Sequence, residues 1–84
     1  MTLEDAIDSI THYATDGRRL GSFLHAVVAN DLCEAIDRAD ATSLANLPAI
    51  VRHLYTSVPM GRWGSYASVA AWLDLKDRER KAQR

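Results

Sequence analysis

The amino-acid sequence predicts an all-α protein, a compact small helical bundle of about four helices that assembles as a homo-oligomer. Apolar residues recur at every third or fourth position in four separate stretches, which is the spacing of amphipathic helices. No stretch alternates convincingly as a strand does, and the connections are short, as between antiparallel helices. A chain of 84 residues forms a single domain, residues 1–84, with a small core. Small chains without disulfides often associate to bury more apolar surface.

The first predicted helix begins after Thr2 and ends at Gly17. Thr2 and Asp5 have the spacing of a capping box, and the acidic residues of the first turn suit the positive end of the helix dipole. Glycine directly after the periodic residues is a stop signal. The apolar face of this helix consists of Leu3, Ala6, Ile7, Ile10 and Ala14.

The second predicted helix begins after Ser22, ends near Asp40 and carries the clearest apolar stripe in the chain. Phe23 and Cys33 widen this stripe, which predicts burial on more than one side. We interpret Cys33 as a buried structural thiol. The stripe consists of Leu24, Val27, Val28, Leu32, Ala35, Ile36 and Ala39.

Two further helices complete the prediction. The third begins between Thr42 and Asn46, so that Pro48 falls within its first turn, where a missing N–H costs little. Its apolar face consists of Leu47, Ile50, Val51, Leu54, Tyr55 and Val58, and Pro59 helps to end it. The fourth is capped by Ser65 and continues into a charged C-terminal tail at about residues 76–84. Its apolar residues are Val69, Ala70, Trp72, Leu73 and Leu75.

Acidic and basic residues are unevenly distributed, although the formal net charge is only −1. Residues 1–16 contain four acids and no lysine or arginine, whereas residues 76–84 contain five basic residues against two acids. This polarity favours head-to-tail or swapped contacts over duplex nucleic-acid binding, which usually needs a basic face. We therefore expect no duplex nucleic acid as a partner. Residues 78–84 are also consistent with a simple solvated tail.

The chain carries no recognisable targeting or membrane segment. Its N-terminus is acidic and lacks a long apolar run, so it resembles neither a signal peptide nor a transit peptide. The apolar stretches are far shorter than the roughly 20 residues that span a bilayer. The single cysteine excludes an intrachain disulfide and fits a reducing compartment. These features predict a soluble cytoplasmic protein without membrane contacts.

The familiar catalytic signatures are missing from the sequence. It contains neither a Walker A loop nor a G-x-S-x-G elbow. His12, His25 and His53 lack the spacing of zinc ligands. We therefore expect no catalytic residues, no metal site and no cofactor.

Two short loops contain all four glycines, "GRRLGS" at residues 17–22 and "GRWGS" at 61–65. Each precedes a predicted helix, whose free N–H groups attract anions, and each contains arginine, whose planar fork suits phosphate oxygens. Glycine lets the backbone approach a ligand closely. Nearby aromatic residues could stack on bases: Tyr13, which lies off the main stripe of the first helix, with Phe23, Trp63 and Tyr66. The alternative is that both loops are plain helix–helix turns and Trp63 is a core side chain.

A longer pattern covers residues 21–73. Its first part is "GSFLHAVVANDLCEAIDRAD", which follows G-S-F-L-x-A-V-x-x-N-D-L-x-x-A-x-x-x-A-D. Its second part is "LPAIVRHLYTSVP", which contains I-V-x-x-L-Y and then a proline, and its third is "WGSYASVAAWL", in which W-G-S leads to W-L. They resemble the anti-CBASS cyclic-nucleotide sponges of phages, which counter cyclic-oligonucleotide-based antiphage signalling. The resemblance implies a non-catalytic, all-helical homohexamer in the host cytoplasm. Such sponges hold cyclic dinucleotides between paired subunits and cyclic trinucleotides at separate three-fold sites.

The resemblance also implies roles for individual residues. Tyr13 is similar to the base-stacking aromatic of the dinucleotide pocket, and the Gly21–Ser22 turn to part of its backbone. A lysine expected near the start of the second helix is absent, so Arg18, Arg19 or His25 would have to replace it. Arg62 is similar to the arginine that contacts phosphate at the three-fold site. The implied dinucleotide residues are Tyr13, Arg18, Arg19, Gly21, Ser22 and His25; the implied trinucleotide residues are Gly61, Arg62, Trp63, Gly64 and Ser65.

Two other function classes stay open at this point. The size, charge asymmetry and turn-like loops are also typical of a small helical protein–protein interaction module of phage or mobile-element origin. A helix-turn-helix DNA-binding domain that uses the basic tail is disfavoured by the near-neutral charge and the lack of a basic recognition helix.

Overall fold

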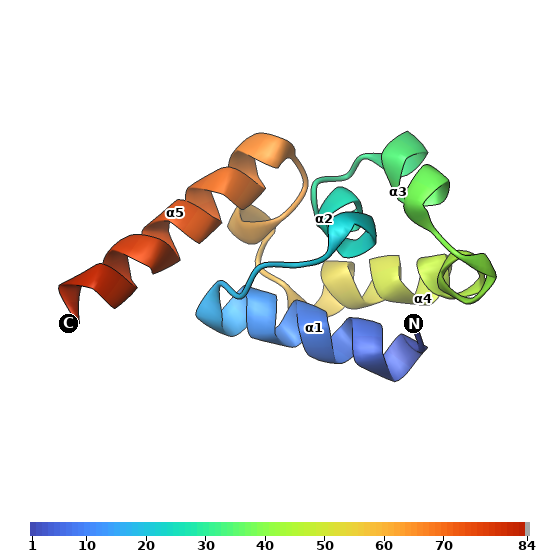
Figure 1. Cartoon of the computed structure of the whole chain (residues 1–84), viewed down its shortest axis with the longest axis horizontal. Coiled ribbons are helices and arrows are strands. Elements are labelled where there is room, and N and C mark those ends of the chain that lie inside the picture. The colour runs from blue at the N-terminus through green and yellow to red at the C-terminus, as the bar shows by residue number, and fades with distance from the viewer. Residues whose placement is uncertain (84) are drawn as a thin grey trace.

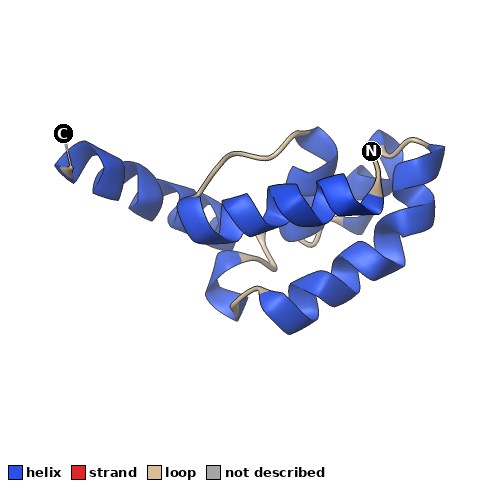
Figure 2. Ribbon diagram, turned by 90° about the horizontal axis from the view of Figure 1, so that it is seen from below, coloured by secondary structure: helices blue, strands red, loops and turns tan. Residues whose placement is uncertain are grey.

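The computed structural model describes residues 1–83. Within them the regular elements are all helices, joined by short loops, and no strand is present (Figure 2). The all-α fold class is therefore confirmed. The helices are α1 (Leu3–Asp16), α2 (Ser22–Val28), α3 (Leu32–Arg38), α4 (Ala41–Ser57) and α5 (Tyr66–Ala82), with one 3₁₀ turn, η1 (Met60–Arg62).

Helix α2 lies at the centre of the molecule. Figure 1 shows α1 and α4 side by side along one side of the body, with α2 over them and α3 folded back against α2. Nearly every residue of α2 belongs to the core, so the predicted burial on more than one side is confirmed for this segment. Its buried residues are Phe23, Leu24, Ala26, Val27 and Val28.

The second predicted helix is wrong as a single helix, because the chain breaks at Asn30. The N–H of Asp31 donates to the carbonyl of Ala26 at 2.9 Å, and the N–H of Asn30 to that of Val27 at 3.0 Å. With Asn30 at φ 60°, these bonds form a Schellman motif that ends α2. The Asp31 carboxylate then accepts from the N–H of Glu34 and begins α3.

The break changes which residues are buried. Only Ala35 is buried on α3, while Leu32 and Ile36 are exposed to 62% and 47%. The interpretation of Cys33 as a buried thiol is also wrong, since this side chain is exposed. The apolar stripe of the sequence continues across Asn30, but the chain changes direction there, so the stripe does not form one continuous face.

Helix α4 begins earlier than predicted. Asp40 accepts a hydrogen bond from the N–H of Ser43 at 2.7 Å and caps the helix at Ala41. Pro48 therefore lies inside the helix and not in its first turn. Because proline has no N–H, one backbone hydrogen bond of the helix is missing at this position. The prediction of Tyr55 as a core residue is wrong as well. Its side chain is 74% exposed, because only the narrow face that carries Ile50 and Leu54 meets the core.

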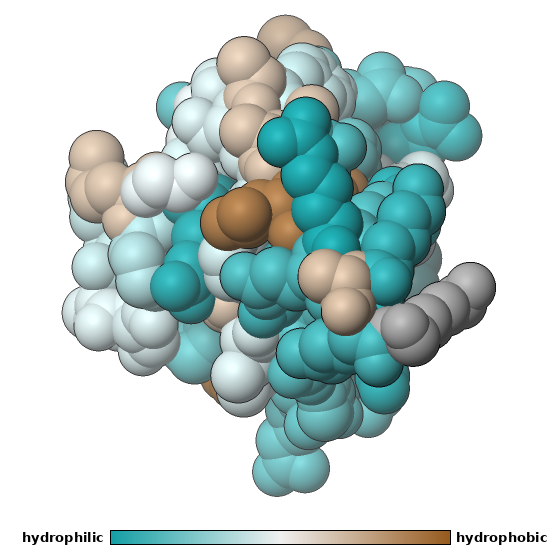
Figure 3. All heavy atoms as spheres, turned by 90° about the vertical axis from the view of Figure 1, so that its left-hand side faces the viewer, coloured by the Kyte–Doolittle hydropathy of each residue, from teal (hydrophilic) through white to brown (hydrophobic). Residues whose placement is uncertain are grey.

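Helix α5 is buried in its first half and projects from the body in its second (Figure 1). Residues Val69, Trp72 and Leu73 pack into the core. The charged tail is helical as far as Ala82, with ion pairs of 2.7 to 2.8 Å between side chains three or four positions apart. Viewed toward this end, the surface is mainly hydrophilic with a small apolar area among the polar side chains (Figure 3).

Candidate functional site

The first loop surrounds a small hollow. Arg18, Arg19 and Gly21, which belong to the predicted dinucleotide set, line a hollow of about 120 Å³ together with His12 and Leu24 of the flanking helices. Both arginines are exposed, and Arg18 has no ion pair among residues 1–83. Ser22 is exposed at the start of α2 but does not line this hollow. The structure therefore places Arg18, Arg19 and Gly21 around one hollow.

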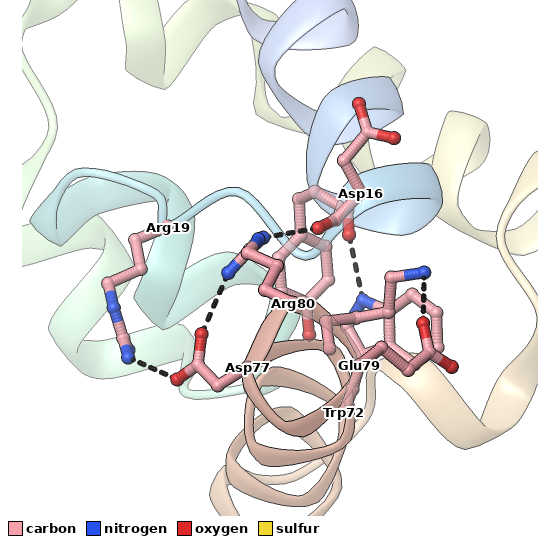
Figure 4. Close-up of polar contacts among 8 residues, drawn as sticks. Asp16, Arg19, Trp72, Asp77, Glu79 and Arg80 are labelled. Carbon is pink, nitrogen blue, oxygen red and sulfur yellow. Dashed lines mark hydrogen bonds and ion pairs between the residues drawn. The ribbon is translucent and has the colours of Figure 1, made fainter. Parts of the chain in front are cut away.

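Arg19 is tied to helix α5 by a chain of polar contacts (Figure 4). Its Nη2 donates to Asp77 at 2.9 Å, and the other carboxylate oxygen of Asp77 accepts from Arg80 at 2.7 Å. Arg80 in turn donates to the backbone carbonyl of Asp16, at the C-terminal end of α1. An anionic ligand would therefore compete with Asp77 for Arg19, whereas Arg18 is free to bind it.

Glycine at position 17 is required by the fold. Gly17 ends α1 in the left-handed conformation at φ 69°, and its N–H donates to the carbonyl of Tyr13 at 3.0 Å. A Cβ at this position would lie 2.4 Å from the Cβ of Lys76 on α5. Gly21 differs, because its φ of −68° suits any residue and no atom lies within 4 Å of an added Cβ. The fold thus requires glycine at position 17, whereas Gly21 is the N-cap of α2, a position that glycine suits but that several polar residues suit as well.

The expectation that Tyr13 lies open beside the first loop is wrong. Its side chain is 1% exposed, and its hydroxyl donates to the backbone carbonyl of Arg62 at 2.5 Å. Burial raises the pKa of Tyr13 from 10.0 to about 12. The Tyr13 carbonyl also accepts from Trp72 Nε1 at 2.7 Å. Tyr13 thus joins α1 to η1 through its hydroxyl and to α5 through its backbone carbonyl, and its buried ring offers no free face to a base.

The second loop connects η1 to α5 and is anchored to α2. Gly64 adopts φ 109°, and its N–H donates to the carbonyl of Val28 at 2.7 Å. Ser65 caps α5 as predicted, accepting from the N–H of Ser68 at 3.0 Å. Trp63 is partly buried, and its Nε1 donates to the carbonyl of Val58 at 3.2 Å. These contacts give Trp63, Gly64 and Ser65 a structural role in the turn. Gly61 differs, because a Cβ added there would meet no atom within 4 Å.

Arg62 is half-buried and engaged with the fold. Its guanidinium carbon lies 4.1 Å from the centre of the Trp72 ring, and Nη1 donates to the carbonyl of Ala14 at 2.7 Å. That carbonyl belongs to the last turn of α1, where a cation is favourable. Arg62 also lines an open hollow of about 340 Å³ with Thr15 and His53. The predicted trinucleotide arginine therefore has part of its fork already occupied.

The two loops line separate hollows. Arg18 and Arg19 lie around the first, Arg62 lies in the hollow between α1 and α4, and none of the hollows described here contains arginines from both loops. His25 lies apart from Arg18 and Gly21, in a further hollow that it shares with Arg19. The predicted dinucleotide residues are thus divided: Arg18, Arg19, Gly21 and His25 line two hollows that share Arg19, Tyr13 lies in the core, and Ser22 is exposed outside both hollows.

Tyr66 was predicted only as a nearby aromatic residue that could stack on bases and belonged to neither implied residue set, yet it lines that further hollow. Its ring centre lies 5.8 Å from that of His25, and its hydroxyl donates to Asp31 at 2.6 Å. This hydrogen bond lowers the pKa of Asp31 and raises that of Tyr66. Its position directly after the second loop made Tyr66 a nearby aromatic residue, but no sequence signal placed it beside His25.

An apolar surface extends over α3 and α4. Leu32, Ile36 and Leu44 are exposed to between 47% and 62%. Beside them lies a groove whose apolar lining comes from α2, α3 and α4: Val27, Leu32, Ala35, Leu47 and Val51. We call this the α3–α4 surface. A contiguous apolar patch of several hundred Å² commonly marks a contact with another protein.

Comparison with models of protein families, with curated proteins and with solved structures found no match. Within residues 1–83, no histidine, cysteine and carboxylate side chains cluster as metal ligands would. None of the described helices combines the length and the apolar character that crossing a membrane requires.

Proposed function

We propose that the protein is a non-catalytic sponge that binds cyclic di- and trinucleotides and thereby blocks host antiphage signalling. The resemblance of residues 21–73 to the phage sponges supports this proposal. The structural observation that carries it is the hollow of the first loop, where Arg18 and Arg19 lie beside Gly21. Gly21 caps α2 and has open space around it, so a ligand can approach the backbone closely there.

Charge in this hollow suits a phosphate group. An exposed guanidinium donates two parallel N–H bonds to phosphate oxygens, and each charge-assisted bond contributes roughly 1.5–3 kcal/mol. Asp8 also lines the hollow, 3.6 Å from His12, but the two arginines outnumber this single carboxylate. The loop therefore favours an anion over a cation.

The size of the hollow indicates that one subunit is not enough. Sites for small molecules usually have volumes of about 300–1,000 Å³, whereas this hollow has about 120 Å³. It fits a phosphate group, and a second subunit would have to enclose the remainder of a cyclic dinucleotide. Self-association, as a homohexamer in the proposed assembly, supplies that second wall. The α3–α4 surface supports association, because burying it would remove exposed leucine and isoleucine side chains from water.

A separate trinucleotide site around Gly61, Arg62, Trp63, Gly64 and Ser65 belongs to the same proposal. Its support is the open hollow beside Arg62, with Thr15 and His53 as further polar groups. Gly61 lies in open space, as Gly21 does. Arg62 would act as a partly engaged arginine there, held in place by Trp72 and Ala14.

Calorimetry of the full chain against a panel of cyclic di- and trinucleotides tests the proposal. We expect tight binding of at least one cyclic dinucleotide and its release intact when the protein is denatured. Replacing Arg18 and Arg19 together by alanine should weaken binding by at least about a hundredfold, since two charged hydrogen bonds are lost. The matched control replaces the exposed Arg38 and Arg52, which removes the same charge elsewhere. Equal losses in both variants, or release of a cleaved ligand, would contradict the proposal.

The second candidate function, a small helical protein–protein interaction module of phage or mobile-element origin, is favoured by the α3–α4 surface. Light scattering distinguishes the two. The sponge should be a stable oligomer, and Leu32→Glu, at a side chain that is 62% exposed, should shift it toward the 9.3 kDa monomer without loss of helix content. A parent protein that is monomeric at micromolar concentration and binds no cyclic nucleotide would favour the interaction module.

A further inference from the structure

A hollow between the first loop, α2 and the start of α5 combines groups that recognise a nucleobase. It is open to solvent and measures about 410 Å³. We call it the Tyr66 hollow. Its lining includes an aromatic pair, an apolar side chain, a cation and two carboxylates: His25, Tyr66, Leu73, Arg19, Asp74 and Asp77.

Tyr66 is held in place and is still accessible. Its hydroxyl donates to Asp31 at 2.6 Å, and its ring is tilted by 37° against that of His25. The residue is nevertheless 49% exposed. An aromatic ring that is already oriented loses little freedom when a base stacks on it. Tyr66 can therefore provide the stacking surface that the buried Tyr13 does not.

The carboxylates of the hollow favour one type of base edge. Both oxygens of Asp77 are used, by Arg19 and by Arg80. Asp74 uses one oxygen for Arg78 at 2.8 Å, and its other oxygen has no partner among residues 1–83. A carboxylate only accepts hydrogen bonds. Guanine offers neighbouring N–H donors on its Watson–Crick edge, whereas adenine places a ring-nitrogen acceptor there.

Arg19 connects this hollow to the hollow of the first loop. It lines both, and Figure 4 shows its side chain directed toward Asp77. A nucleotide whose base lies in the Tyr66 hollow could therefore direct its phosphate toward Arg19 and Arg18. This arrangement places a base site and an anion site next to each other on a single subunit.

We propose that the Tyr66 hollow is a guanine subsite, in which Tyr66 stacks on the base, Asp74 accepts from its N–H groups and Arg19 faces the phosphate. The assignment of a cyclic oligonucleotide as the ligand rests on the proposed function, whereas the base subsite itself does not. The subsite therefore predicts that guanine-containing ligands are preferred over adenine-containing ones.

Calorimetry with cyclic di-GMP and cyclic di-AMP, and with GMP and AMP as smaller probes, tests the subsite. We expect the guanine ligand of each pair to bind about tenfold more tightly. Tyr66→Ala should weaken guanine binding by about tenfold or more, while Tyr66→Phe, which keeps the ring, should bind within about threefold of the parent. Asp74→Asn should bring the guanine-to-adenine ratio close to one. The matched controls are Tyr55→Ala and Asp37→Asn, at exposed positions outside the hollow; circular dichroism checks that each variant is folded.

The outcomes separate the subsite from the proposed function. If the parent binds cyclic dinucleotides, but Tyr66→Ala and Asp74→Asn match their controls, the subsite is refuted and the sponge function stands. If GMP binds in a Tyr66-dependent manner and no cyclic oligonucleotide binds, the sponge function is refuted and the subsite stands. Preference for adenine would overturn the subsite. It would also be overturned if the hollow bound an arginine-rich peptide instead of guanine and Asp74→Asn abolished that peptide binding.

Discussion

Arg62→Ala should destabilise the protein, because Arg62 joins three elements of the fold. The substitution removes the hydrogen bond from Nη1 to the Ala14 carbonyl and the contact with the Trp72 ring. A hydrogen bond from a charged group contributes roughly 1.5–3 kcal/mol, and a cation–π contact about 0.5–2 kcal/mol. Arg62 is only half-buried, so water replaces part of what is lost. We expect a loss of about 2 kcal/mol in the free energy of unfolding.

Urea denaturation measures this loss. The variants are compared at equal protein concentration, because association makes the apparent stability depend on concentration. A loss of this size corresponds to a fall of about 10 °C in Tm for a chain of this length. Arg62→Met keeps an apolar stem on the Trp72 ring but removes the charge and the hydrogen bond, so it should fall between the parent and Arg62→Ala. Arg52→Ala, at an exposed position on α4, is the matched control. A loss below about 0.5 kcal/mol for Arg62→Ala would refute a structural role, since exposed substitutions lie within that range.

The same substitution tests the proposed trinucleotide site. At three-fold symmetry, one change removes three phosphate contacts, so the affinity for a cyclic trinucleotide should fall by on the order of 4 kcal/mol, about a thousandfold. Binding has to be measured at a temperature at which circular dichroism shows the variant to be folded. A folded Arg62→Ala protein that binds cyclic trinucleotides as tightly as the parent would remove Arg62 from the site.

Two further predictions concern the first loop and its surroundings. Gly17→Ala should destabilise the protein by at least about 1–2 kcal/mol in urea denaturation, since alanine is strained at φ 69° and its Cβ would collide with Lys76. Gly21→Ala, at the N-cap of α2, should cost no more than about 1 kcal/mol and weaken nucleotide binding in calorimetry. Burial raises the pKa of Tyr13 from 10.0 to about 12, so the neutral phenol stabilises the fold fully below pH 10 and this contribution is lost as the pH rises through 12. Circular dichroism should show an alkaline loss of structure in that window, and Tyr13→Phe, which cannot ionise, should shift it to higher pH; an unchanged alkaline transition in Tyr13→Phe would show that another group controls it.

Local signals in the sequence determined the helical class and several helix ends. The cap at Thr2, the stop at Gly17 and the cap at Ser65 were all predictable, because each depends on a side chain or a φ angle within a few residues. The clustering of Arg18, Arg19 and Gly21 in one hollow also follows from their closeness in the sequence. Periodicity alone gives the wrong helix at Asn30, because the apolar stripe continues through a residue that ends one helix and an aspartate that begins the next.

Contacts between distant segments were decided only by the tertiary structure. Tyr13 and Arg62 are 49 residues apart, and their hydrogen bond turns a proposed stacking residue into a core residue. The separation of His25 from the first-loop hollow, and its meeting with Tyr66, likewise depend on how α2 packs against α5. Helical spacing shows that a residue can lie on an apolar face, but not which other helix that face meets. Burial of a ring and the partners of a guanidinium arise from that packing, which no single stretch of sequence specifies.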